Sequence, residues 1–63
     1  MIHTYVAIEY KFDYAIPPRS ETKSMIVDYP IRTSSDMNDL QSDINQKFGQ
    51  DCPIIFMKEF GDD

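Results

Sequence analysis

The alternation of residues between Thr4 and Tyr14 constrains the fold of this chain more than any other feature of its sequence. The even positions are mostly apolar or aromatic, whereas the odd positions change from apolar to charged along the segment. A period of two is the spacing of a β-strand, and a helix does not produce it. We therefore expect a strand over about residues 3–14 whose even side chains face the core, with Tyr10 and Tyr14 among the core residues.

The segment after this strand predicts a hairpin with a long connection. Pro17 and Pro18 lack backbone donors, so the ladder must stop and an exposed, proline-rich loop is expected over residues 15–21. The apolar run Met25-Ile26-Val27, bounded by Pro30, indicates a second strand over about residues 22–29.

A helix and a third strand are expected in the second half of the chain. Apolar residues recur there at helical spacing, and they are Met37, Leu40, Ile44 and Phe48. The segment Thr33-Ser34-Ser35-Asp36 offers several candidate N-caps, and Gly49 can take the left-handed C-cap, which places the helix over about residues 35–48. An apolar run without alternation follows Pro53, and it predicts a third strand over about residues 53–60, covered on both faces along much of its length and frayed from Gly61.

The order β-β-α-β fits one domain, because 63 residues are near the lower limit for a chain that folds without metals or disulfides. A right-handed crossover makes the second and third strands parallel to each other, and each is then antiparallel to the first. The expected fold is α+β, a single small domain over residues 1–63. Its three-stranded, mainly antiparallel sheet has the order 2-1-3, with one helix on one face.

One helix covers only one face of such a sheet, so the other face is a candidate interface. We expect it to carry Tyr5, Ala7, Ile55 and Met57. Two interpretations remain open: these residues form an oligomer or partner interface, or Ile55 and Met57 are covered by the proline-rich loop or by repacked termini.

The acidic balance of the chain is confined to its second half. Residues 1–33 have no net charge, so residues 34–63 carry the whole net charge of −5. Asp36, Asp39 and Asp43 line one side of the expected helix, beside its apolar stripe, and form an acidic rim. This rim is either a solvated helix face or a surface that recognises a basic protein; direct nucleic-acid binding is not expected, because lysine and arginine are outnumbered.

Candidate residues for other chemistry are few. Arg19, expected at the tip of the proline-rich loop, could anchor in a partner's acidic pocket, although such loops usually serve only as connections. His3 and Cys52 are the only candidates for a base and a nucleophile, and the expected strand order places them far apart. The sequence predicts no catalytic residues, no metal site and no cofactor, and hence no enzyme.

Two functions from different classes are consistent with these features. The first is a small acidic, non-enzymatic protein-binding module that inhibits or modulates a larger protein with a basic surface. By class analogy, it could be a phage-encoded inhibitor of a host nucleic-acid-handling or defence complex. The second is a structural homodimer or accessory subunit whose open sheet face is an oligomer interface. A cytoplasmic location away from membranes is expected, since the chain has a single cysteine, no long apolar run and no signal-peptide pattern after Met1.

Overall fold

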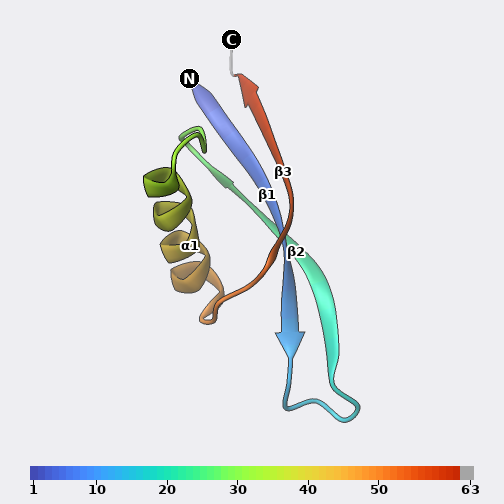
Figure 1. Cartoon of the computed structure of the whole chain (residues 1–63). Helices are drawn as coiled ribbons and strands as arrows, with labels where there is room; N and C mark the ends of the chain where they lie inside the picture. The colour runs from blue at the N-terminus through green and yellow to red at the C-terminus, as the bar shows by residue number, and fades with distance from the viewer. Residues whose placement is uncertain (62–63) are drawn as a thin grey trace.

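The computed structural model describes residues 1–61, which form three strands and one helix (Figure 1). The elements are β1 (Ile2–Phe12), β2 (Arg19–Val27), α1 (Ser34–Phe48) and β3 (Ile54–Gly61). Both outer strands are antiparallel to β1, in the order β2-β1-β3, and α1 lies against one face of the sheet. The small α+β fold and the strand order expected from the sequence are confirmed.

The hairpin between β1 and β2 is tighter than expected. Its register pairs Phe12 with Arg19, so only residues 13–18 reverse the chain and β2 begins three residues before its expected start. Only Pro17 and Pro18 lack a backbone N–H there, and pairing therefore resumes directly after them. Tyr14 lies in this turn with 81% of its surface exposed, so its expected place in the core is wrong.

The core lies between α1 and the face of β1 that carries its even-numbered residues. Its buried members come from all parts of the chain, and they are Val6, Ile8, Val27, Leu40, Ile44 and Cys52. Thr4 is also buried on this face, and its hydroxyl donates to the Tyr29 carbonyl at 2.7 Å. The alternation of β1 and the helical stripe of α1 therefore meet as expected, and the polar Thr4 is satisfied by a hydrogen bond.

Both ends of α1 are capped by residues that the sequence suggests. The Thr33 hydroxyl accepts the N–H of Asp36 at 3.1 Å, and the Asp36 carboxylate accepts the N–H of Thr33 at 3.2 Å. This reciprocal pair is a capping box, with Asp in the place usually held by Glu or Gln. At the other end, Gly49 has φ 75° and donates its N–H to the Asn45 carbonyl at 2.8 Å.

The helix covers β1 and one end of β2 but leaves most of β3 uncovered. Figure 1 shows α1 on the side of β1 away from β3. Only Ile54, the first residue of β3, packs against the buried core, and the other residues of the strand are exposed. The expectation that β3 is covered on both faces is therefore wrong, because the helix crosses the sheet over its other two strands.

The molecule is elongated, with principal extents of 44 × 22 × 15 Å. The register of β1 with β3 ends at Ile8, and just beyond it the Glu9 N–H donates to the Pro53 carbonyl at 3.0 Å. Tyr10 still packs against Phe48 of α1, and the rest of the hairpin, residues 11–20, continues as a two-stranded arm that projects below α1 in Figure 1. Within residues 1–61, no helix is both long and apolar enough to cross a membrane.

Candidate protein-binding surface

The face of the sheet opposite α1 is assembled from the odd-numbered residues of β1 and their partners. Residues directly opposite each other in an antiparallel pair project to the same face. Tyr5 pairs with Ile26 of β2, while Ala7 pairs with Phe56 and His3 with Phe60 of β3. The apolar members of this face form what we call the open-face patch: Tyr5, Ala7, Ile26, Phe56 and Phe60.

The open-face patch is accessible along all three strands. Ile26 is 56% exposed, Phe56 52%, Phe60 38% and Tyr5 36%. The rings of Tyr5 and Phe56 meet edge to face with centroids 6.2 Å apart, and Ala7 between the strands is buried. Large apolar side chains gathered on one uncovered face are typical of protein interaction sites.

Of the four residues expected on this face, Met57 does not lie on it, and Ile55 falls in a bulge of β3. Met57 pairs with Val6, so its side chain lies on the face that carries α1 rather than on the open face. The register shifts between Ala7 and Ile8, whose partners are Phe56 and Ile54, and it skips Ile55. This bulge in β3 reverses the alternation, because one extra residue moves every later side chain to the opposite face.

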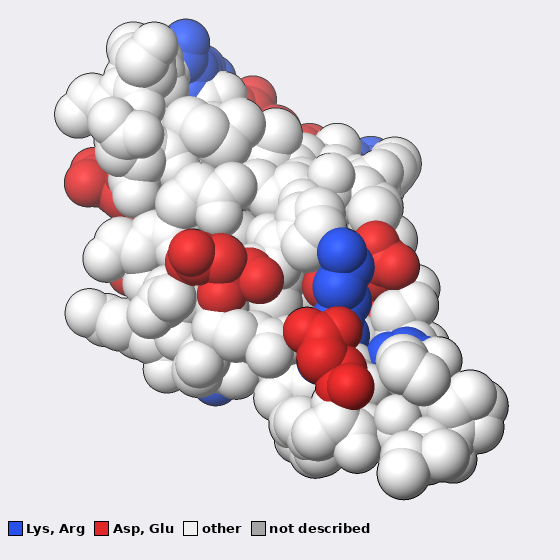
Figure 2. All heavy atoms as spheres, turned by 60° about the horizontal axis from the view of Figure 1, so that its bottom comes forward, with Lys and Arg blue, Asp and Glu red and all other residues white. Residues whose placement is uncertain are grey.

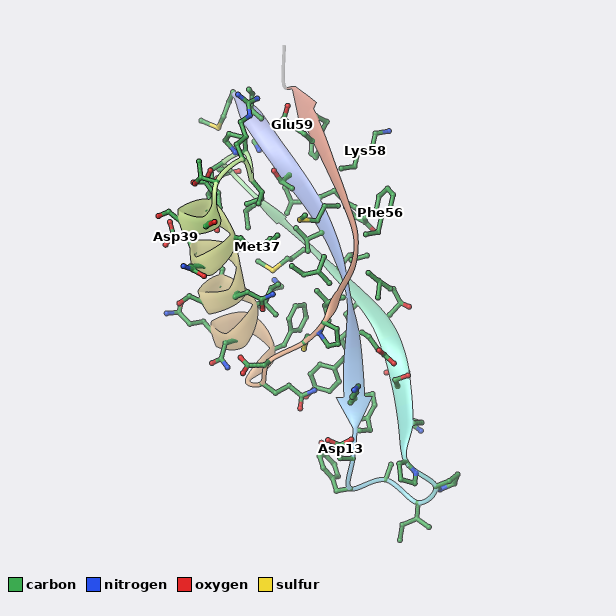
Figure 3. The ribbon with its side chains drawn as sticks, in the orientation of Figure 1. Asp13, Met37, Asp39, Phe56, Lys58 and Glu59 are labelled. Carbon is green, nitrogen blue, oxygen red and sulfur yellow. The ribbon has the colours of Figure 1, made fainter. Side chains whose placement is uncertain are left out.

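Polar groups flank the patch near the N-terminal end of β1. His3 Nδ1 lies 2.8 Å from Asp28 Oδ1, and the His3 ring stacks on Phe60 with centroids 5.3 Å apart. A shallow hollow of about 360 Å³ opens here, lined by His3, Ile26, Asp28, Phe60 and Gly61. Figure 3 shows Phe56 and Lys58 on the side of β3 away from α1, so a cation also borders the patch.

Of the three carboxylates in the acidic rim, Asp36 has a structural role. Its Oδ2 accepts the N–H groups of Arg32 at 3.1 Å and Thr33 at 3.2 Å, within the capping box. A carboxylate in the first turn also interacts favourably with the positive end of the helix dipole. Replacement of Asp36 would therefore change helix stability together with surface charge.

Asp43 is also engaged inside the molecule, by the hydroxyl of Tyr29. This hydroxyl donates to Asp43 Oδ2. Partial burial of Tyr29 raises the pKa of the phenol well above its usual value of 10.0, and the hydrogen bond to Asp43 and the negative charge of the rim raise it further. The phenol therefore stays neutral and serves as a donor that anchors the α1 carboxylate to the segment after β2.

Asp39 is the rim residue whose carboxylate makes no hydrogen bond within residues 1–61. It is exposed, and Figure 3 shows it pointing away from the sheet, on the side of the molecule opposite Phe56. The acidic rim and the open-face patch therefore do not form one continuous surface. Figure 2 shows the carboxylates of the face in view as separate groups, with basic side chains next to those on the right.

Arg19 does not lie at the tip of a loop. It is the first residue of β2 and pairs with Phe12, and its guanidinium carbon lies 4.8 Å from the centroid of the Phe12 ring. The cation-π contact holds Arg19 along the arm. Its expected position is wrong because the strand resumes directly after Pro18, while the tip of the arm carries Tyr14 and the fully exposed Ile16.

His3 and Cys52 lie at opposite ends of β3. His3 pairs with Phe60 near the end of the strand, whereas Cys52 is buried in the core just before its start, and the Cys52 thiol faces the Gln50 carbonyl at 3.6 Å. Eight residues of strand separate the two ends by about 27 Å, so these side chains do not act on one substrate atom. No cluster of His, Cys, Asp and Glu suited to a metal ion occurs in residues 1–61.

Three residues of the open-face patch were missed by sequence reasoning: Ile26, Phe56 and Phe60. Ile26 lies in the run Met25-Ile26-Val27, whose alternation is hidden because all three positions are apolar. The pairing of Ile26 with Tyr5 could have been derived had the hairpin register been known. Phe56 and Phe60 required the position of the bulge, for which the sequence offers no signal.

Comparisons with known proteins add no assignment. No family model, no curated protein and no solved structure matches the chain.

Proposed function

We propose that this chain is a non-enzymatic protein-binding module that inhibits or modulates a larger protein through its open-face patch. The observation that carries the proposal is the uncovered sheet face, where Tyr5, Ile26, Phe56 and Phe60 are each more than a third exposed. Apolar and aromatic side chains with a polar border are the composition of protein interfaces. The net charge of −5 favours a partner that places basic residues around an apolar centre.

The geometry shifts the proposed contact from the acidic rim to the sheet. Two of the three rim carboxylates are occupied by Thr33 and Tyr29, and the third lies on the other side of the molecule. In this proposal the helix acids contribute to long-range attraction and solubility, whereas the open-face patch contributes contact area. A finer form of the proposal is a phage-encoded inhibitor that acts on a nucleic-acid-handling or defence complex of the host. It is a class analogy, supported by the small size, the acidic second half and the uncovered sheet face.

The test compares the partner captured by three forms of the chain. Tagged wild type, Ile26→Glu and Ile16→Glu are cross-linked in the cells that express the chain, and captured proteins are identified by mass spectrometry. Ile26 is in the open-face patch and Ile16 in the hairpin turn, and both are exposed, so neither substitution buries a charge. We expect a partner retained by Ile16→Glu and lost with Ile26→Glu; equal retention by both would refute an interface on the open face.

The same experiment examines the role of charge. Asp39→Lys changes the rim without disturbing the capping box or the Tyr29 hydrogen bond. If the rim steers a basic partner, this variant and added salt should both weaken capture. If either Asp39→Lys or added salt leaves capture unchanged, the acidic rim contributes only to solubility.

A further inference from the structure

The two edges of the sheet differ in their protection against pairing with another strand. The β2 edge is polar over residues 19–24 and is preceded by Pro17 and Pro18. The β3 edge carries large apolar side chains at five of its eight positions, and most of them are exposed. Natural proteins protect edges with charges and prolines. β3 has no proline, and its two charges follow the apolar run 54–57, so this uncovered run indicates a strand that pairs with another chain.

The backbone groups of β3 that face outward follow from the register. The Glu9 N–H bonds to the Pro53 carbonyl, and the Lys11 carbonyl accepts from Gln50, so the odd-numbered residues of β1 direct their backbone groups toward the β3 side. Their partners Phe56, Lys58 and Phe60 then bond to β1, because backbone direction alternates along a strand. Met57 and Glu59 accordingly direct their N–H and C=O groups outward from the sheet.

We propose that a second copy of this chain occupies this edge, with β3 antiparallel to β3 of the second copy about a two-fold axis at Met57. A two-fold axis perpendicular to the sheet places one residue opposite the same residue of the second copy. Equivalent side chains of the two copies then lie on the same face of the sheet. The dimer is then a continuous six-stranded sheet with both helices on one face. The proposal is independent of a foreign partner on the open-face patch, since edge pairing leaves that face accessible.

The charges of β3 select this axis among the alternatives. An axis at Lys58 or Glu59 would place two like charges directly opposite each other, which destabilises a sheet. An axis at Phe56 would shorten the overlap to residues 54–58. With the axis at Met57, residues 54–60 overlap and each Phe56 lies opposite Lys58 of the second copy, an arrangement that allows a cation-π contact.

The size of the edge sets the expected strength of the dimer. Eight residues span about 27 Å, and the sheet is about 10 Å thick, so the edge of β3 offers each partner a contact area of about 270 Å². Standard interfaces cover about 800 Å² on each partner, so the dimer should dissociate on dilution. Each copy carries a net charge of −5, and screening of this repulsion should make association stronger as salt increases.

The primary test uses complementary charges at the axis. Met57→Lys and Met57→Glu place like charges at the two-fold axis in a homodimer, whereas a mixture of the two variants places opposite charges there. Met57 is 38% exposed, so a charged side chain at this position keeps contact with solvent in the monomer. Thr22→Lys and Thr22→Glu, on the exposed β2 edge, are the matched controls. The solution mass of each form is measured by sedimentation velocity over a concentration and salt series, with circular dichroism to verify folding.

We expect wild type and both Thr22 variants to dimerise reversibly, each Met57 variant to be monomeric, and the equimolar Met57 mixture to recover the dimer. A wild type that stays monomeric at all concentrations and salt levels would overturn the proposal. Dimers that persist in both single Met57 variants, or a mixture of monomers that does not associate, would also overturn it. Salt should strengthen this dimer but weaken capture of a basic partner, so failure of this proposal is distinguishable from failure of the proposed function.

A measurement on the wild type alone covers the case in which the Met57 variants do not fold. Amide hydrogen exchange of Met57 and Glu59 should slow as protein concentration rises, because their outward N–H groups gain acceptors in the dimer. Exchange at Thr22 and Ser24, which occupy the outward positions of the β2 edge in the same register, should not change. Concentration-independent exchange at Met57 and Glu59 would refute edge pairing through β3.

Discussion

The two faces of the sheet contain similar side chains but have opposite surroundings. On the covered face, Val6 and Ile8 are fully buried against Leu40 and Ile44 of α1. On the open face, Phe56 and Ile26 are about half exposed, although both are as apolar as the core residues. The comparison shows that the exposure of an apolar residue in this small fold depends on the position of the single helix, not on hydrophobicity. Substitutions can measure how much the side chains on each face contribute to the free energy of unfolding.

The largest difference is expected between Leu40→Ala and Phe56→Ala. Loss of the fully buried Leu40 side chain leaves a cavity in the core and should lower the free energy of unfolding by about 2–5 kcal/mol. Loss of the half-exposed Phe56 ring should cost a small part of that amount. Urea denaturation followed by circular dichroism measures both, and comparable losses would mean that the open face is already covered in solution.

The hydrogen bond between Tyr29 and Asp43 should have an intermediate effect. Tyr29→Phe removes the donor and should lower the free energy of unfolding by about 1–2 kcal/mol, because the acceptor is a charged group. The loss of stability caused by Tyr29→Phe should also depend on pH. The pKa of Tyr29 is raised in the folded chain, so its stabilising contribution is complete below pH 10.0 and falls as pH rises above that value, where the unfolded chain loses the proton first.

Denaturation of wild type and Tyr29→Phe at neutral pH and above pH 10.0 tests this sign. The difference in stability between the two should narrow at high pH. A difference that is constant with pH would show that the phenol has no preferential protonation in the folded state.

The smallest effect is expected at the start of α1. Asp36→Ala breaks the capping box and should lower the free energy of unfolding by about 1 kcal/mol. Asp39→Ala, in the same helix but without a hydrogen bond among residues 1–61, should change stability by less than about 0.5 kcal/mol. Thermal or urea unfolding of Asp36→Ala and Asp39→Ala measures the two losses of stability. Equal losses would contradict the capping role assigned to Asp36.

The parts of the fold that the sequence could predict depend on local patterns. The alternation from Thr4 to Phe12, the helical stripe through Leu40 and Ile44, and the caps at Thr33 and Gly49 each involve neighbouring residues. Their order, combined with the handedness of crossover connections, was sufficient for the strand order β2-β1-β3.

The parts that could not be predicted depend on how the elements meet. A bulge that skips Ile55 reverses the faces of Met57 and Phe56, and no residue in the apolar run of β3 marks its position. The placement of α1 over β1 and β2, which left β3 uncovered, depends on packing across the sheet. Tyr14 continued the alternation past the point where the hairpin register ended the strand, and periodicity alone does not show where pairing stops.

The central position of β1 affects the order in which the fold can form during synthesis. β1 is the first element of the chain, and its two neighbours are made at very different times: β2 follows within the same hairpin, whereas β3 comes only after α1. Chains emerge from the ribosome with the N-terminal part first, and non-local contacts form more slowly than local ones. The edge of β1 that pairs with β3 is therefore the last part of the sheet to gain its partner as the chain is made.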